Sequence, residues 1–203
     1  MFSIIGARTA DFNPNISPDL INLALLSPAV SELAGADLKR WVLWRWEINA
    51  QGKPTKVPYQ AWSPDTLARS NDPTTWATFD VAYARLKKGD SGADGVGFML
   101  LDSGYAAFDL DHCRDPETSA IEPWAQRIID QAETYCEVTP SRTGVRIIGK
   151  ASGANITKLF KGPDYGFKEG TGFEIYRNNA RYITMTGYAI GHDDEPCKPR
   201  RAH

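Results

Sequence analysis

A chain of 203 residues with 42% hydrophobic content can bury one sizeable core, which argues against two independent enzymatic domains. Its formal net charge of -2 argues against a protein that holds nucleic acid by bulk electrostatics, because that mode needs many phosphate-neutralising Lys and Arg side chains. Its three cysteines are widely spaced and fit neither a disulfide framework nor a paired-cysteine zinc site, so we expect a reducing cytoplasm and no zinc.

Composition divides the chain into three parts. Residues 1–37 form a polar, proline-punctuated extension, in which Ser17-Pro18 is typical of the start of a short helix running to about Ala34. Residues 38–190 are predicted to form the single globular domain, and 191–203 form a polar tail that is a candidate linker to a further region. Apolar runs are too short to span a bilayer, so we expect no membrane partner.

The globular part opens with two strands and a helix. Segments 41–44 and 56–59 flank a turn at Gln51-Gly52 and are typical of a β-hairpin. A helix is predicted from Asp72-Pro73 to Gly89, because four apolar residues recur there at helical spacing: Trp76, Phe79, Tyr83 and Leu86.

Short turns separate most of the remaining predicted elements. In chain order these are strands 95–101 and 105–111, joined at Ser103-Gly104; helix 123–133; strands 137–139 and 145–149 around a turn at 141–144; a mobile Gly- and Lys-rich loop at 151–170; and a hairpin of 173–176 with 181–186. This pattern favours an α+β fold, with an antiparallel or mixed sheet covered by helices, over a doubly wound parallel sheet.

Two acids separated by one residue are the first candidates for chemistry. Asp109 and Asp111 lie in a predicted strand, so alternation points both carboxylates to one face. Like charges so close resist joint ionisation unless a cation neutralises them, which suits Mg²⁺ or Mn²⁺. The alternative is a strand end whose acids simply face water.

A third acid follows the same logic. Phe173 and Ile175 are predicted to face a core, which leaves Glu174 on the opposite face. Three carboxylates on one sheet face can hold two metals about 3.5 to 4 Å apart, the geometry of nucleotidyl transfer. The alternative is an exposed Glu on a half-buried strand.

A hydroxyl-rich turn lies between these acids in the chain. Ser141, Thr143 and Gly144 lead into a strand that projects Arg146 away from its apolar neighbours. Backbone amides, hydroxyls and a guanidinium in one place suit a triphosphate. Ser, Thr and Gly are also frequent in turns for conformational reasons alone.

Taken together, a series of short motifs between residues 38 and 187 resembles phage and plasmid primase-polymerases of the archaeo-eukaryotic primase superfamily. The motifs, in order, are Trp-Val-Leu-Trp at 41–44, Lys-Val-Pro-Tyr at 56–59, Asn-Asp-Pro at 71–73 with Trp76, Gly-Val-Gly-Phe at 95–98, Asp-Leu-Asp-His at 109–112, the turn at 141–146, Phe-Glu-Ile-Tyr at 173–176 and the segment 181–187. Their shared order is more specific than any single motif.

The resemblance implies a fold and a set of site residues. It implies an RRM-like sheet on which Asp109, Asp111 and Glu174 bind the catalytic metals, two Mg²⁺ or Mn²⁺ ions. It also implies that Ser141, Gly144 and the residue at 146 meet the phosphates of the incoming nucleotide. The family commonly has His where this chain has Arg146, and Arg can replace His electrostatically but not as a proton donor that titrates near neutrality.

The implied function is template-directed DNA primer synthesis and polymerisation by a two-metal mechanism in phage or plasmid replication. Arg146 and Arg181 would add positive charge at the triphosphate. Expected partners are single-stranded DNA template and primer, nucleoside triphosphates, and a replicative helicase in cis or in trans. Four lysines are candidates for contacts with template phosphates: Lys56, Lys158, Lys161 and Lys168.

Two other functions fit the same residues. One is a non-catalytic nucleic-acid-binding module that serves replication-origin or helicase recruitment, a reading supported by the Arg146 substitution. The other is a metal-dependent nuclease that uses the same acids. A nuclease would not need the phosphate-binding turn and would degrade DNA without consuming nucleotides.

Overall fold

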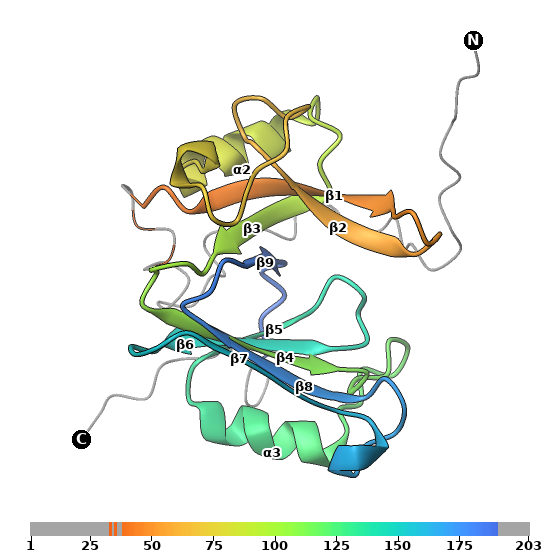
Figure 1. Cartoon of the computed structure of the whole chain (residues 1–203). Helices are drawn as coiled ribbons and strands as arrows, with labels where there is room; N and C mark the ends of the chain where they lie inside the picture. Colours follow the sequence, from red (N-terminus) through yellow and green to blue (C-terminus); the bar gives the residue numbers. More distant parts are fainter. Residues whose placement is uncertain (1–32, 34, 36–37, 191–203) are drawn as a thin grey trace.

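Two antiparallel sheets organise the chain in the computed structural model, which describes residues 33, 35 and 38–190 (Figure 1). Sheet A has the strand order β2-β1-β3-β9 and sheet B the order β5-β6-β4-β8-β7. The predicted helix before Ala34 and the polar tail lie outside the described residues, apart from Leu33. Leu33 is helical and buried, and its carbonyl accepts a hydrogen bond from Trp41 Nε1 at 3.0 Å.

Sheet A is built from strands distant in the chain, and helix α2 packs on it. Its strands are β1 (Trp41–Ile48), β2 (Pro54–Tyr59), β3 (Gly95–Met99) and β9 (Tyr182–Met185). Helix α2 (Phe79–Lys88) begins after the N-cap Thr78, whose hydroxyl accepts from Val81 N, and ends at the left-handed Gly89. Phe79 packs edge-to-face on Trp41 with the ring centroids 4.7 Å apart, which fixes α2 on β1.

Sheet B carries the acidic strand at its centre. Its strands are β4 (Tyr105–Asp111), β5 (Tyr135–Val138), β6 (Val145–Lys150), β7 (Ile156–Lys161) and β8 (Gly172–Arg177). Helix α3 (Pro123–Ala132) lies below it in Figure 1, on the side away from sheet A. Ala125 and Ile129 of α3 pack in one buried cluster with Leu110, Val145 and Ile147. One face of sheet B is therefore apolar, and its other face is turned toward sheet A.

Strand β9 joins the two sheets. Ile183 and Met185 enter the large core that also contains Tyr135 and Tyr176 of sheet B. Alternation turns Tyr182 and Thr184 to the opposite side of the strand, where Thr184 bonds to Arg146 of sheet B. The edge of sheet A thus separates an apolar core from a polar region between the sheets.

One predicted hairpin is wrong, and two further strands joined by a short turn are not paired. The strands at 95–101 and 105–111 exist but lie in different sheets, and so do those at 173–176 and 181–186. Both connections cross between the sheets side by side, tied by Leu100 N to Arg181 O at 2.9 Å and Asp102 N to Asn178 Oδ1 at 2.9 Å. Pairing each strand with a distant partner lets both sheets bury their shared core, which a local hairpin would not achieve.

Two further segments differ from expectation. The predicted helix at 72–89 is a 3₁₀ turn, η3 (Pro73–Thr75), an extended link and then α2, because Ala77 pairs with Trp41 of β1 through two backbone hydrogen bonds. The predicted loop at 151–170 contains β7 and the 3₁₀ turn η4 (Pro163–Tyr165). Strand β7 pairs with β8 along its length, and Phe160 stacks on Phe173 of β8 with the ring centroids 4.8 Å apart.

The hairpins β1–β2 and β5–β6 and the helix at 123–132 confirm the corresponding predictions. The fold class is α+β, with two antiparallel sheets where one was expected, and it is compatible with a primase-polymerase fold. The RRM-like arrangement and the domain boundaries stay predictions. None of the helices in the described part of the chain is long and apolar enough to cross a membrane.

Candidate active site

Four charged residues form one row across sheet B. Glu137 of β5 pairs with Arg146 of β6, Arg146 with Asp109 of β4, and Asp109 with Glu174 of β8. Directly opposed residues in antiparallel strands project from the same face, and Asp111 shares that face two residues further along β4. The three acids singled out in the sequence are therefore brought to one face.

Asp109 is held in a buried ion pair. Arg146 Nε lies 2.6 Å from Asp109 Oδ1, and the two side chains are only 6% and 15% exposed. Arg146 Nη1 also donates to Thr184 Oγ1 at 2.7 Å and to the Thr184 carbonyl. Burial alone would raise the pKa of Asp109, but the Arg146 guanidinium outweighs it and holds that pKa below its ordinary value.

Arg146, which was predicted to meet the phosphates of the nucleotide, is buried. Its Nε and Nη1 donors are engaged by Asp109 and by Thr184 of β9. In this arrangement Arg146 orients Asp109 and ties sheet B to sheet A.

Glu137 is a residue that the sequence reasoning missed. It is fully buried, and its carboxylate accepts hydrogen bonds from Tyr135 Oη at 2.9 Å, Thr186 N at 3.0 Å and Gly187 N at 2.9 Å. Burial raises its pKa above the ordinary value for Glu. The signal was its position opposite Arg146 in the predicted hairpin, because two opposite charges facing each other across a strand pair interact.

Asp111 and Glu174 share a different cation. Lys161 Nζ of β7 lies 2.5 Å from Asp111 Oδ2 and forms a second ion pair with Glu174 Oε1. Arg181 approaches the other oxygen of Glu174 at 3.8 Å and stacks over the Tyr176 ring, 3.8 Å from its centroid. Lys161 was predicted to contact template phosphates, and here it lies among the acids.

Lys56 enters the same region from sheet A. Its ammonium lies over the Trp46 ring, 5.2 Å from the centroid. Burial and the nearby Arg146 guanidinium lower the pKa of Lys56 to about 8, although Asp109 and Asp111 act in the opposite direction. The acids thus face a cation of the opposite sheet.

The hydroxyl-rich turn lies beside the carboxyl end of β4, because Leu110 pairs with Val145 at the start of β6. Ser141 Oγ lies 3.1 Å from Thr139 Oγ1 and 3.0 Å from Thr143 Oγ1, so three hydroxyls form a chain. A Cβ at Gly144 would lie 2.6 Å from the Leu110 carbonyl oxygen, so glycine permits this close approach. The turn and Asp111 are neighbours, as a triphosphate site would require.

Comparison with known proteins finds a related phage enzyme. No protein-family model matches the sequence. A curated relative, the DNA primase-polymerase of Nitratiruptor phage NrS-1, is 33% identical over 174 residues, a span that covers 82% of this chain. This similarity supports a primase-polymerase family assignment. The chain spans 21% of the length of that relative.

Of the other two lysines of the primase-polymerase prediction, Lys158 lies on the face of sheet B opposite the acids. Lys158 is exposed on β7, and alternation turns it to the face opposite Lys161. Lys168 is exposed in the turn between η4 and β8. The four lysines therefore form no single patch.

The carboxylates of the candidate site were predicted to hold divalent ions, and their present partners are cationic side chains. Within residues 33, 35 and 38–190, no three Asp, Glu, His or Cys side chains are arranged as a complete metal site. The acids are instead arranged around the guanidinium of Arg146 and the ammonium of Lys161. Asp111 and Glu174 nevertheless converge on one cation with Asp109 alongside, and all-carboxylate donors suit Mg²⁺ or Mn²⁺. These carboxylates would fit a divalent ion if the Lys161 ammonium moved away from them.

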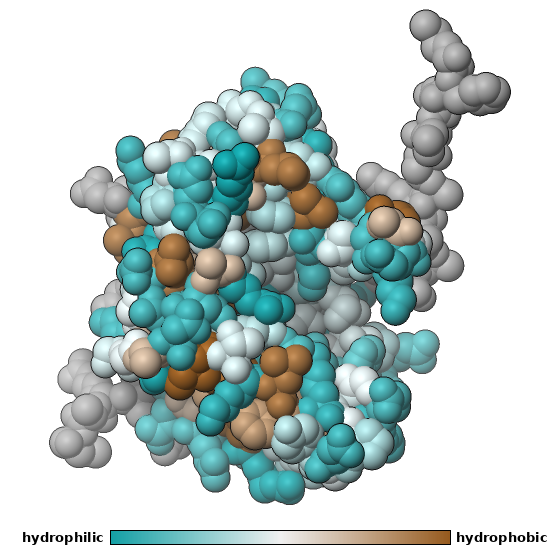
Figure 2. All heavy atoms as spheres, viewed as in Figure 1, coloured by the Kyte–Doolittle hydropathy of each residue, from teal (hydrophilic) through white to brown (hydrophobic). Residues whose placement is uncertain are grey.

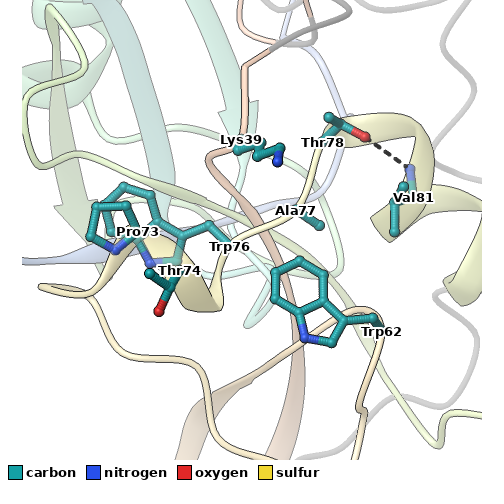
Figure 3. Close-up of a pocket in the computed structure, with 8 residues that line it drawn as sticks. All are labelled: Lys39, Trp62, Pro73, Thr74, Trp76, Ala77, Thr78 and Val81. Carbon is teal, nitrogen blue, oxygen red and sulfur yellow. Dashed lines mark hydrogen bonds between the residues drawn. The ribbon is translucent and has the colours of Figure 1, made fainter.

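A separate cavity of about 290 Å³ lies between η3, the start of α2 and the residues before β1 (Figure 3). It is lined by Lys39, Trp62, Pro73, Thr74, Trp76, Ala77, Thr78 and Val81. Trp62 is 50% exposed, whereas Trp41, Trp44 and Trp76 are buried. No acid of the candidate site lines this cavity, so it is distinct from the candidate site. Elsewhere on the face shown in Figure 2, hydrophobic residues occur in separate groups among hydrophilic ones.

Proposed function

We propose that this chain is the catalytic domain of a primase-polymerase and joins nucleotides on a single-stranded DNA template by a two-metal mechanism. The observation that carries the proposal is that Asp109, Asp111 and Glu174 lie on one face of sheet B, the face turned toward sheet A. The similarity to a phage DNA primase-polymerase supports the same reaction class.

Each acid has a defined part in this mechanism. Asp111 and Glu174 would hold a divalent ion at the position where they now meet Lys161, and Asp109 would complete the site. Bound ions supply Lewis acidity that activates a 3′-hydroxyl and stabilise charge on the triphosphate. Arg146 keeps Asp109 ionised and oriented, because it forms a charge-assisted hydrogen bond at 2.6 Å.

The neighbouring cations and hydroxyls would bind the nucleotide. Ser141, Thr143 and the backbone around Gly144 offer hydroxyl and amide donors beside Asp111, which suits phosphate oxygens. Arg181 is 48% exposed and lies at Glu174, so it can reach a phosphate group without leaving the site. Single-stranded template, primer, nucleoside triphosphates and a replicative helicase are the partners that we propose.

The test is a synthesis assay with labelled nucleotides, single-stranded DNA and Mn²⁺ or Mg²⁺, with and without a primer. We expect incorporation by the wild type and loss in Asp111→Asn. Asp80→Asn, on the exposed surface of α2, is the matched control and should synthesise normally. DNA degradation without nucleotide use would instead indicate a nuclease, and DNA binding without incorporation a non-catalytic module.

A further inference from the structure

Lys161 occupies the space between two of the proposed metal ligands. Its Nζ lies 2.5 Å from Asp111 Oδ2 and also contacts Glu174 Oε1. The side chain of Lys161 is 30% exposed and those of Asp111 and Glu174 are 34% and 12% exposed. The ammonium therefore lies at the rim of the site, where solvent and ions have access.

Gly172 makes this contact possible. It pairs with Asp111 of β4 on one side and with Lys161 of β7 on the other, so these three residues form one row. Because Gly172 has no side chain, Lys161 can extend across β8 to the carboxylate. A Cβ at Gly172 would lie 2.2 Å from the Phe160 carbonyl oxygen, and its φ of +142° favours glycine.

The charges divide the acids into two groups. Arg146 neutralises Asp109 from a buried position, whereas Lys161 neutralises Asp111 and Glu174 from a flexible, partly exposed side chain. Lysine is a point charge on a four-carbon stem with many conformations, so it can leave a site that a buried arginine cannot leave. Two carboxylates so close would otherwise resist ionisation in the absence of a metal.

We propose that Lys161 is an internal counter-cation that holds the site between Asp111 and Glu174 until a divalent ion displaces it. The displaced ammonium then binds a phosphate oxygen of the nucleotide that accompanies the ion. This inference rests on the proposed function, because the divalent ion that displaces Lys161 is the ion that the proposed function requires. It makes Lys161 a residue that weakens metal binding without nucleotide and strengthens nucleotide binding with metal.

The experiment measures Mn²⁺ affinity directly, by electron paramagnetic resonance of free Mn²⁺ with the full chain and no nucleotide. We expect Lys161→Met to bind Mn²⁺ about tenfold more tightly than the wild type, because two partly exposed ion pairs no longer compete. Lys158→Met is the matched control, since Lys158 lies on the same strand with its side chain on the opposite face, and it should bind as the wild type does. Lys161→Arg keeps the charge and should stay within about twofold of the wild type.

A second measurement gives the affinity for a non-hydrolysable nucleoside triphosphate in saturating Mn²⁺. Here Lys161→Met should bind the nucleotide several-fold more weakly, so one substitution changes the two affinities in opposite directions. Unchanged or weaker Mn²⁺ binding in Lys161→Met would overturn the inference while leaving the proposed function intact. Absence of Mn²⁺ binding in the wild type and in Lys161→Met alike would overturn the proposed metal site itself. If Lys161→Met does not fold, judged by its urea transition, Lys161→Gln provides the same test.

Discussion

The face of sheet B that is turned toward sheet A contains two clusters with similar charges and different surroundings. In the buried cluster, Arg146 joins Asp109 and is close to Glu137, whose remaining lone pairs are satisfied by backbone amides of residues 186 and 187. In the open cluster, Asp111 and Glu174 depend on Lys161, and the Asp111 and Lys161 side chains are about one-third exposed. The first arrangement stabilises the fold, and the second can exchange its cation. Asp109 lies between the two clusters, because it pairs with Arg146 and lies opposite Glu174 across the strand pair.

The largest effect is expected in the buried cluster. Arg146→Ala would leave two buried carboxylates without their counter-charge, which costs about 3–5 kcal/mol of unfolding free energy. Urea denaturation of the variant against the wild type measures this loss. Arg127→Ala, on the exposed side of α3, is the control and should change stability by less than about 0.5 kcal/mol. A loss under about 1 kcal/mol for Arg146→Ala would mean that the cluster is not structural.

The second prediction separates Asp109 from Asp111. Each Asp→Asn substitution should lower nucleotide incorporation more than about 100-fold, since ligands matter more than the groups that orient them. Asp111→Asn should cost about 1 kcal/mol of stability or less, because its ion pair is partly exposed. Asp109→Asn should cost clearly more, because it breaks a buried pair. Equal stability losses would contradict the division into two clusters.

The third prediction concerns pH and the cation of sheet A that faces both clusters. Lys56 has a folded-state pKa of about 8 and an ordinary value near 10.5, so between these values the unfolded chain binds more protons than the folded chain. Stability contributed by Lys56 should therefore rise as pH increases from about 8 to 10.5. The difference in unfolding free energy between wild type and Lys56→Met, measured across this range, should follow that rise. If the unfolding free energies of wild type and Lys56→Met changed with pH in parallel, Lys56 would not be close to Arg146.

The smallest effect is expected on the apolar face of sheet B. Cys113 and Cys136 are buried there, and burial raises the pKa of Cys113 to about 11. In a Cys197→Ser background, iodoacetamide at pH 8 should leave both thiols unmodified in the native protein and modify both in urea. Mass spectrometry gives the readout. Rapid native labelling would show that this face opens to the reagent without global unfolding.

The sequence by itself determined those features of the site that depend on one strand or one turn. Period-two alternation placed Asp109 and Asp111 on one face, and the turn at 141–144 predicted the β5–β6 hairpin. These features are local, because backbone geometry and turn chemistry act over a few residues.

Only the tertiary structure decided which strands are neighbours and which cations meet the acids. Strands β8 and β9 follow each other in the chain but belong to different sheets, since pairing with distant strands buries the shared core. The pairing of β7 with β8 then places Lys161 across Gly172 from Asp111, and β2 brings Lys56 to the same site from the other sheet. Such contacts join residues far apart in the chain, so their partners are set by the burial of whole sheet faces and not by any local pattern.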